Sequence, residues 1–132
     1  MTRLRLLLAD DHEAIRVSLA MLLRRRVGEL TVASDGEEAW RIYSEKGVDV
    51  VMTDLRMPHL DGVALARRIR AKEDAGERRT TVIATSAARE DDAAVLGDRS
   101  LFDYALSKPL SPPQLFELLE RIALEKEGGL LS

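Results

Sequence analysis

The stretch that decides the fold is VVMTDLRMPHLDG, residues 50–62. It begins with an uncharged run, residues 50–53, that ends at Asp54, and it continues with Met57-Pro58 and Asp61-Gly62. A short uncharged run is typical of a strand buried on both faces, as in a parallel sheet covered by helices. The Pro and Asp-Gly residues are typical of a turn and of a helix start. The stretch therefore predicts strand, turn and helix, with Asp54 at the first junction.

Outward from this stretch, apolar runs suited to strands alternate with segments of helical period. The strand-like runs are residues 4–9, 30–33, 50–53, 81–85 and 104–106. The segments between them and after the last run place apolar side chains on one helical face: Ile15, Leu19, Leu22 and Leu23; Ala39, Ile42 and Tyr43; Leu65, Ala66 and Ile69; and Leu115, Leu118, Leu119 and Ile122. This alternation predicts an α/β fold with one parallel sheet covered on both sides.

Helix starts are marked by capping residues. Asp35 and Asp61 are expected to cap helices that begin at the glycines following them, and Ser111 is expected to cap the last helix. Residues 89–102 carry only a short apolar pattern, so a fourth helix there would be short or loose. The charged residues 72–79 are interpreted as an exposed loop before the fourth strand.

Composition limits the class of protein. The chain has 132 residues, 45% of them hydrophobic, which suits a single domain. Its net charge of -3 gives no strong field for nucleic acid or anionic lipid, so direct nucleic-acid binding and membrane association are not expected. Cysteine is absent, which excludes disulfides and thiolate metal sites. Without a signal-peptide pattern or an apolar run of roughly 18 residues, a cytoplasmic location is expected.

Polar side chains gather where the predicted strands end. Asp10 and Asp11 follow the first strand, Asp54 the third, Ser86 the fourth and Lys108 the fifth. Ligands of open parallel sheets bind at the carboxyl ends of strands, and if the first and third strands are neighbours, three carboxylates meet there. Their mutual repulsion calls for a cation. Oxygen ligands without His or Cys favour Mg²⁺ or Mn²⁺, and Mg²⁺ commonly accompanies a phosphoryl group.

A phosphoryl group at this edge would meet several functional groups. Lys108 offers an ammonium and Ser86 a hydroxyl, both able to donate to phosphoryl oxygens. Aspartate is a known covalent phosphoryl acceptor. Asp54 is our candidate for that nucleophile, because it stands alone at its strand end and faces the Asp10-Asp11 pair.

These motifs, in their order and spacing, resemble the response-regulator receiver domain of two-component phosphorelay signalling. The resemblance spans nearly the whole chain and rests on Asp10-Asp11, Asp54 with Met57-Pro58 and Asp61-Gly62, Ser86-Ala87, and Lys108-Pro109. It implies a flavodoxin-like (βα)5 fold with a five-stranded parallel sheet in order 2-1-3-4-5 and helices on both faces. It also implies that residues 1–126 form the domain and 127–132 a short C-terminal tail.

The resemblance also implies roles for individual residues. Asp54 would take a phosphoryl group from a histidine kinase or a histidine phosphotransfer protein. Asp11, Asp54 and the backbone carbonyl of Arg56 would ligate Mg²⁺, and Asp10 would act through a bound water. The protein would be a signalling phosphoacceptor that catalyses its own phosphorylation and dephosphorylation rather than an enzyme with a separate substrate.

Further implied roles concern the signal. Lys108 would bridge to the phosphoryl group, with a cis bond to Pro109. Ser86 would be the switch hydroxyl, moving with Ala87 and the loop after the fourth strand. The side chain of Arg56, two positions after Asp54, would either shield the acyl phosphate from water or steer water to it, and the sequence leaves both open.

Two positions depart from the family pattern. The usual aromatic switch position is Ala105, while Tyr104 is one residue earlier and is expected to point to the other side of the strand. Leu101 stands where a glycine is common. One explanation is ordinary drift, with Leu101 and Phe102 packed in the core; the other is a face that binds a particular partner or changes shape without the aromatic. On the second, phosphorylation would shift this face through the loop at Ser86 alone.

Two other functions compete with the phosphoacceptor role. A Mg²⁺-dependent phosphatase would use strand-end aspartates, but its D-x-D pattern is missing at Asp54. A degenerate receiver acting as a phosphorylation-independent docking module is the other alternative, and the intact set of Asp11, Asp54, Ser86 and Lys108 argues against it. The downstream effector is not identified, and the chain is either a stand-alone regulator or shuttle, or a receiver that belongs to a longer regulator or to a hybrid kinase.

Overall fold

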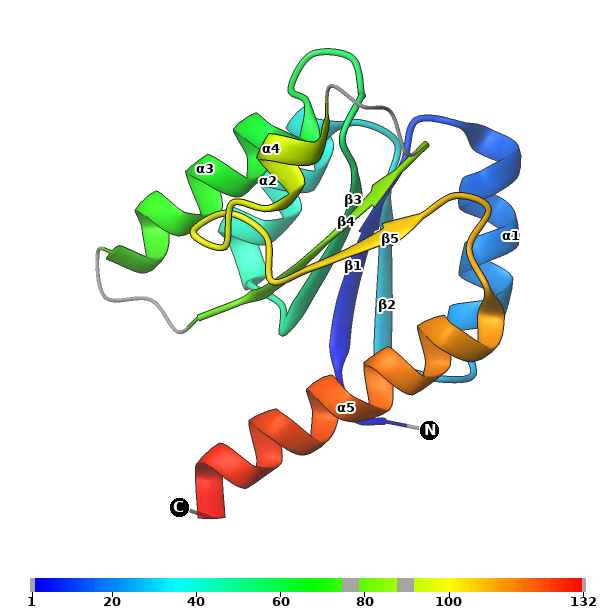
Figure 1. Cartoon of the computed structure of the whole chain (residues 1–132), viewed down its shortest axis with the longest axis vertical. Helices are drawn as coiled ribbons and strands as arrows, with labels where there is room; N and C mark the ends of the chain where they lie inside the picture. Colours follow the sequence, from blue (N-terminus) through cyan, green and yellow to red (C-terminus); the bar gives the residue numbers. More distant parts are fainter. Residues whose placement is uncertain (1, 75–78, 88–91, 132) are drawn as a thin grey trace.

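The computed structural model describes residues 2–74, 79–87 and 92–131, and it contains five strands and five helices over these residues (Figure 1). The strands are β1 (Arg5–Ala9), β2 (Glu29–Ala33), β3 (Val50–Asp54), β4 (Thr81–Ser86) and β5 (Tyr104–Ser107). The helices are α1 (Glu13–Leu23), α2 (Gly36–Lys46), α3 (Gly62–Asp74), α4 (Ala93–Leu96) and α5 (Pro112–Leu131). Each predicted strand is present, with its bounds within about one residue of the prediction, as expected for element ends.

All five strands are parallel, in the order β2-β1-β3-β4-β5. The predicted flavodoxin-like topology is thus confirmed. β1 and β3 are neighbours, with Leu6 opposite Val50 and Ala9 opposite Thr53. This pairing is the condition under which the acidic residues after β1 and at the end of β3 meet.

Helices cover both faces of the sheet, α1 and α5 on one and α2, α3 and α4 on the other (Figure 1). Successive side chains of a strand point to opposite faces, so each central strand supplies both cores. In β1, Leu7 packs on the α2 and α3 side, while Leu6 and Leu8 pack on the α1 and α5 side. This explains why the central strands are apolar throughout.

The predicted helix faces are confirmed with one exception. Buried members include Leu19 and Leu23 in α1, Leu65, Ala66 and Ile69 in α3, and Leu115 and Ile122 in α5. The exception is Leu22, which is 38% exposed. At 100° per residue it lies at the edge of the apolar stripe, beside the exposed Met21, so its assignment to the buried face was wrong.

The expected caps are present. Asp35 Oδ1 accepts a hydrogen bond from the Glu38 amide, and Asp61 Oδ1 accepts one from the Ala64 amide, each at 2.8 Å. The Ser111 hydroxyl accepts one from the Gln114 amide at 3.4 Å. α4 has four residues, as short as predicted. α5 continues to Leu131, so helical backbone extends past the predicted domain boundary at residue 126.

Two glycines allow close backbone approaches near the carboxyl end of β3. A Cβ at Gly62 would collide with the backbone carbonyl oxygen of Asp54, and a Cβ at Gly36 with that of Leu60. The Gly62 amide also donates to the Leu55 carbonyl at 2.9 Å. The start of α3 is therefore pressed against the end of β3, which only glycine permits.

The charged segment before β4 differs from the prediction. α3 continues through residues 72–74, and Glu73 has a side chain only 9% exposed. Residues 75–78 lie outside the described part of the chain. Arg70 explains the burial, because its guanidinium donates to Glu73 and to the Thr80 carbonyl, the latter at 2.7 Å. The interpretation of residues 72–79 as an exposed loop was therefore wrong for Glu73.

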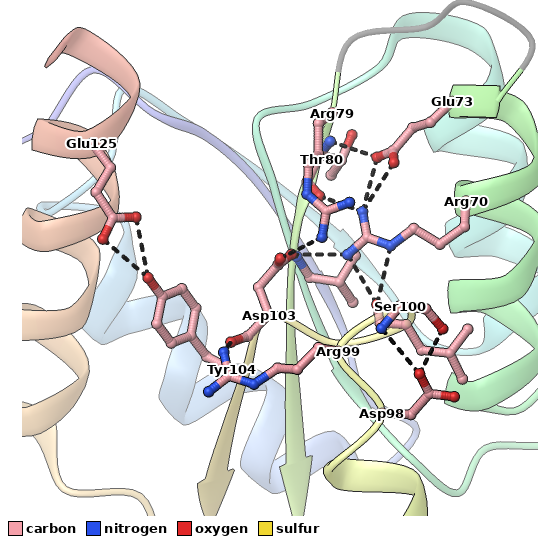
Figure 2. A network of polar contacts seen from close by, with 12 residues as sticks. Arg70, Glu73, Arg79, Thr80, Asp98, Arg99, Ser100, Asp103, Tyr104 and Glu125 are labelled. Atoms are coloured by element: carbon pink, nitrogen blue, oxygen red, sulfur yellow. Dashed lines mark hydrogen bonds and ion pairs between the residues drawn. The ribbon is translucent and has the colours of Figure 1, made fainter. Parts of the chain in front are cut away.

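Arg70 is the centre of a polar network that joins α3 to the starts of β4 and β5. Figure 2 shows its guanidinium between Glu73 and Asp103. The Arg70 side chain is 10% exposed. It donates to Asp103 Oδ2 at 2.8 Å and to the Leu101 carbonyl at 2.9 Å. Arg79 donates to the other Asp103 oxygen at 2.7 Å (Figure 2). We call Arg70, Glu73, Arg79, Thr80 and Asp103 the Arg70 network.

The segment before β5 packs as ordinary core. Leu101 is 7% exposed and Phe102 is 1% exposed, which confirms the explanation that places both side chains in the core. Phe102 joins the cluster on the α2 and α3 side. Among the described residues, no helix combines the length and apolar character that crossing a bilayer requires.

Candidate functional site

The predicted site residues meet at the carboxyl ends of the strands. Asp10 directly follows β1 and Lys108 directly follows β5. Asp54 and Ser86 are the last residues of β3 and β4 rather than the first residues beyond them, a small correction to the predicted strand ends. The order β1-β3-β4-β5 places these four ends next to one another.

Three carboxylates form a cluster. Oxygen atoms of Asp10, Asp11 and Asp54 all lie within 4.8 Å of one another. Asp10 is buried, Asp54 is half-buried and Asp11 is exposed. Asp10 is fixed from its own loop, because its Oδ1 accepts a hydrogen bond from the His12 amide at 2.9 Å. Carboxylates this close repel unless a cation shares the site, as the sequence led us to expect.

Lys108 provides one cation. Its Nζ lies 3.0 Å from Asp54 Oδ2 and 3.3 Å from Asp10 Oδ2. Burial alone would lower the pKa of Lys108, but the hydrogen bond and charge of Asp54, together with Asp10, outweigh burial and raise it above its ordinary value. The Lys108–Pro109 peptide is cis, as the family resemblance implied. The Lys108 amide donates to the Ser86 carbonyl at 2.7 Å, which joins the ends of β4 and β5.

The predicted switch positions Ser86, Ala87 and Ala105 fall into two groups. Ser86 is 2% exposed, and it lines a cavity of about 130 Å³ together with Asp54, Ala87 and Lys108. Ala105 is exposed on β5 and does not line that cavity. Tyr104 packs with the core on the α1 and α5 side, and its hydroxyl donates to Glu125 of α5 at 3.1 Å (Figure 2). Tyr104 therefore points away from the aromatic switch position, as predicted.

Sequence reasoning missed Asp92. It is 7% exposed, and one oxygen accepts a hydrogen bond from the Ser86 hydroxyl at 3.0 Å. The other oxygen lies 2.6 Å from Nη2 of Arg56. Asp92 belongs to no motif and lies within residues 89–102, the segment predicted to be least regular, so only its proximity to Ser86 and Arg56 in the folded chain reveals it.

Arg56 is placed by the turn after β3. Its amide donates to Asp54 Oδ1 at 3.4 Å, so its backbone lies next to the candidate nucleophile. Its guanidinium is directed toward Asp92 and lines the same small cavity. The turn itself is closed by the Leu60 amide, which donates to the Pro58 carbonyl at 2.8 Å. Arg56 thus stands between the acidic cluster and the start of α4.

The donor set fits a hard divalent cation. The cluster offers only oxygen atoms, and it carries three negative charges against the single ammonium of Lys108. Such a site favours Mg²⁺ or Mn²⁺ over softer metals. An anionic oxygen ligand placed beside Asp54 would meet that cation, Lys108 and the Ser86 hydroxyl together.

Comparison with known proteins agrees with this geometry. The family model of the response regulator receiver domain matches residues 6–120. The transcriptional regulatory protein SrrA of Staphylococcus aureus is 32% identical over 110 residues, which cover 83% of this chain. The match covers 44% of SrrA, so the chain spans less than half of that relative. The chain belongs to the response-regulator receiver family of two-component systems.

Solved structures show the same architecture. The N-terminal domain of an uncharacterised protein from Wolinella succinogenes superposes with a TM-score of 0.84 and 31% identity, covering 96% of this chain and 98% of that one. The receiver domain of a sensor histidine kinase from Pseudomonas aeruginosa has a TM-score of 0.75 and 29% identity, with coverages of 92% and 98%. That structure contains a magnesium ion in its active-site cleft.

Proposed function

We propose that this protein receives a phosphoryl group on Asp54 in a Mg²⁺-dependent reaction and signals by a change of its surface. The observation that carries the proposal is the position of Asp54, whose Oδ2 lies 3.0 Å from Lys108 Nζ inside the acidic cluster. A carboxylate so placed has an ammonium ready to neutralise an incoming phosphoryl oxygen. Membership of the receiver family supports a role as a phosphoryl acceptor.

The proposed metal ligands are Asp11, Asp54 and the backbone carbonyl of Arg56, with Asp10 acting through a water. The three carboxylates offer oxygen atoms within 4.8 Å of one another, which suits a single ion. When bound, Mg²⁺ would supply positive charge against the phosphoryl oxygens. Asp10 is held by the His12 amide and Lys108, so its role is to position charge rather than to move.

In the proposed step, a carboxylate oxygen of Asp54 attacks phosphorus in line with the leaving group. The new O–P bond forms as the N–P bond of a phosphohistidine breaks, and the electron pair returns to the histidine nitrogen. Lys108 contacts one phosphoryl oxygen and Ser86 donates its hydroxyl to another. The reverse fate is hydrolysis, in which water attacks phosphorus and the Asp54 carboxylate leaves. The protein thus acts on itself rather than on a separate substrate.

The proposed phosphodonor is a histidine kinase or a histidine phosphotransfer protein, and the recipient of the signal is an effector protein or domain of unknown identity. The switch would work through Ser86 and Ala87 without an aromatic at Ala105. The cytoplasmic location, the division into residues 1–126 and a tail, and the absence of direct contacts with nucleic acid or membrane remain predictions.

The test is to incubate the protein with Mg²⁺ and acetyl phosphate and to measure the intact mass. We expect the mass of one phosphoryl group to be added to the parent and not to Asp54→Asn, with circular dichroism confirming that the variant is folded. Omitting Mg²⁺ should also prevent the addition. Asp61→Asn, a nearby cap residue outside the carboxylate cluster, is the matched control and should still be modified.

The other outcomes identify the competing functions. Turnover of a phosphomonoester without a stable mass change would indicate a phosphatase. A protein that is folded yet unmodified under all conditions would indicate the docking module. Modification that persists in Asp54→Asn would place the acceptor elsewhere.

A further inference from the structure

Asp92 uses its carboxylate in an unusual way for its position. It occupies the N-cap position of α4, yet no side-chain capping hydrogen bond is made there. Its two oxygens instead accept hydrogen bonds from side chains that precede it in the sequence, one from the Ser86 hydroxyl and one from the Arg56 guanidinium. At 7% exposure it is a buried acid held by these contacts. Because Asp92 makes no capping hydrogen bond, the position of its carboxylate is set by Ser86 and Arg56.

The two donors that Asp92 holds both adjoin the proposed phosphoryl site. Ser86 is the switch hydroxyl, and Arg56 is two residues after Asp54 with its amide 3.4 Å from Asp54 Oδ1. All four residues line the same cavity of about 130 Å³. A phosphoryl group on Asp54 and the carboxylate of Asp92 would therefore compete for the same hydroxyl and the same guanidinium.

We propose that Asp92 is a positioning residue that holds Ser86 and Arg56 in the unphosphorylated protein and is displaced when the phosphoryl oxygens take both donors. The proposal rests on the proposed function of Asp54. It adds a residue that sets how readily the phosphorylated state forms, and it gives the start of α4 a direct connection to the site.

The competition has a clear direction. A phosphoryl group offers three oxygens and nearly two negative charges at neutral pH, and guanidinium binds such groups in a two-pronged geometry. Asp92, once deprived of both donors, would be a buried carboxylate without compensation and must move toward water. Because Asp92 directly precedes α4, its movement displaces Ala93–Leu96.

This arrangement also explains how the switch can work with Ala105. The exposed methyl group of Ala105 cannot fill or vacate a space as a ring does, and Tyr104 is engaged with Glu125 on the other side of β5. Asp92 instead couples the site to α4 through charge. The coupling passes through two hydrogen bonds of Asp92, at 3.0 Å from the Ser86 hydroxyl and 2.6 Å from the Arg56 guanidinium, and does not require β5 to move.

The experiment measures occupation of the site by beryllofluoride, a phosphoryl mimic, with fluorine NMR in the presence of Mg²⁺. We compare the parent with Asp92→Asn, which keeps the shape and removes the charge. Loss of one charge-assisted competitor should lower the beryllofluoride concentration for half-occupation by about tenfold. The matched control is Asp98→Asn, an equal charge change on an exposed residue after the same helix, which should shift it by less than about twofold.

A merely structural role for Asp92 is separated by a double-variant comparison. In an Arg56→Met, Ser86→Ala background neither side chain can donate a hydrogen bond, so adding Asp92→Asn should produce no further gain in beryllofluoride affinity. The same gain in that background as in the parent would overturn the proposal. Equal affinities of Asp92→Asn and the parent would overturn it too.

A second measurement follows the start of α4 directly. Amide exchange at Ala93–Gly97 in the parent should accelerate when beryllofluoride saturates the site, and Asp92→Asn should show the faster exchange before any is added. Unchanged exchange in the saturated parent would overturn the coupling to α4. If the parent neither binds beryllofluoride nor accepts a phosphoryl group, the proposed function of Asp54 has failed instead, so the two failures are distinguishable.

Discussion

The two edges of the sheet carry charged clusters of opposite design. At the edge where β4 and β5 begin, the Arg70 network balances two guanidinium groups against two carboxylates and adds backbone carbonyls (Figure 2). At the edge where the strands end, three carboxylates face the single ammonium of Lys108. The first cluster is complete in itself, whereas the second has excess negative charge that an added cation would neutralise.

The difference suggests that the Arg70 network contributes to stability and that the carboxylate cluster serves ligand binding. Among the described residues, no buried side-chain nitrogen or oxygen lacks a hydrogen-bond partner. Both clusters therefore satisfy their hydrogen bonds, and only the site leaves charge unbalanced. We expect changes in the Arg70 network to alter stability, and changes at the site to alter ligand binding with smaller effects on stability.

The largest expected effect comes from breaking the balanced cluster. Arg70→Met should lower the free energy of unfolding by about 3 to 5 kcal/mol, because it leaves the largely buried Glu73 carboxylate without its guanidinium partner and removes one of the two guanidinium groups that hold Asp103. Urea denaturation measures this change. Arg68→Met on the same helix, with a side chain 44% exposed that makes surface contacts with Glu37 and Trp40, is the control and should change it by less than about 1 kcal/mol.

The comparison requires that phosphorylation survive this damage. Folded Arg70→Met should still accept a phosphoryl group from acetyl phosphate at Asp54. A folded variant that cannot do so would show that the two edges are not independent.

A moderate effect is expected from filling the unbalanced cluster. At a Mg²⁺ concentration about ten times its Kd, the ion should raise the free energy of unfolding of the parent by about 1.4 kcal/mol. Asp11→Asn should remove most of this gain, because an exposed ligand and a negative charge are lost. Glu13→Gln, outside the carboxylate cluster, is the control. Equal Mg²⁺ stabilisation of all three proteins would contradict the site.

The two edges should also fail at opposite ends of the pH scale. Partial burial alone would raise the pKa of Asp103, but the Val82 amide and the Arg79 and Arg70 guanidinium groups outweigh it and hold the pKa below its ordinary value. A lowered folded-state pKa gives stability that is present above the unfolded value and lost as pH falls through the folded value. Asp103→Asn should therefore lose less stability than the parent between pH 6 and about 3.

For Lys108 the sign is reversed. Its pKa is raised in the folded protein, so its contribution is fully present below the unfolded value, about 10.4, and is lost as pH rises through the folded value. Lys108→Met should show a shallower loss of stability than the parent at alkaline pH. Urea denaturation at several pH values measures both slopes, and identical slopes for parent and variant would contradict the assignment.

The smallest effect is expected from a residue that belongs to neither cluster. Tyr104→Phe removes a hydroxyl that donates to exposed Glu125, so stability should change by less than about 1 kcal/mol. The half-life of phosphorylated Asp54, followed by intact mass, should be unchanged. A shortened or lengthened half-life would mean that Tyr104 reaches the switch despite facing α5.

Most of the fold was predictable because its signals are local. Apolar runs located every strand in the described part of the chain, and helical periods identified the apolar faces of α1, α2, α3 and α5. Capping residues located the starts of α2, α3 and α5. The convergence of Asp10, Asp54 and Lys108 followed from one topological rule about strand ends. Leu22 failed because period alone does not fix the edge of an apolar stripe.

The interactions that the sequence concealed join residues far apart along the chain. Arg70 and Asp103 are separated by 33 positions, and Arg56 and Asp92 by 36. An arginine in a helix and an aspartate in an irregular segment both look like ordinary solvent-exposed charges. Only the folded chain shows that each is buried against its partner, which is why Arg70 and Asp92 were missed.

The close approach at Gly62 affects which side of Asp54 can rearrange. Since no methyl group fits between this residue and the Asp54 carbonyl, the end of β3 and the first turn of α3 are in direct backbone contact. If Asp54 gained a charged group, as proposed, the backbone at the start of α3 would have little room to rearrange around it. We therefore expect a structural response to that charge on the side of β4, because the backbone on the side of α3 is too tightly packed to rearrange.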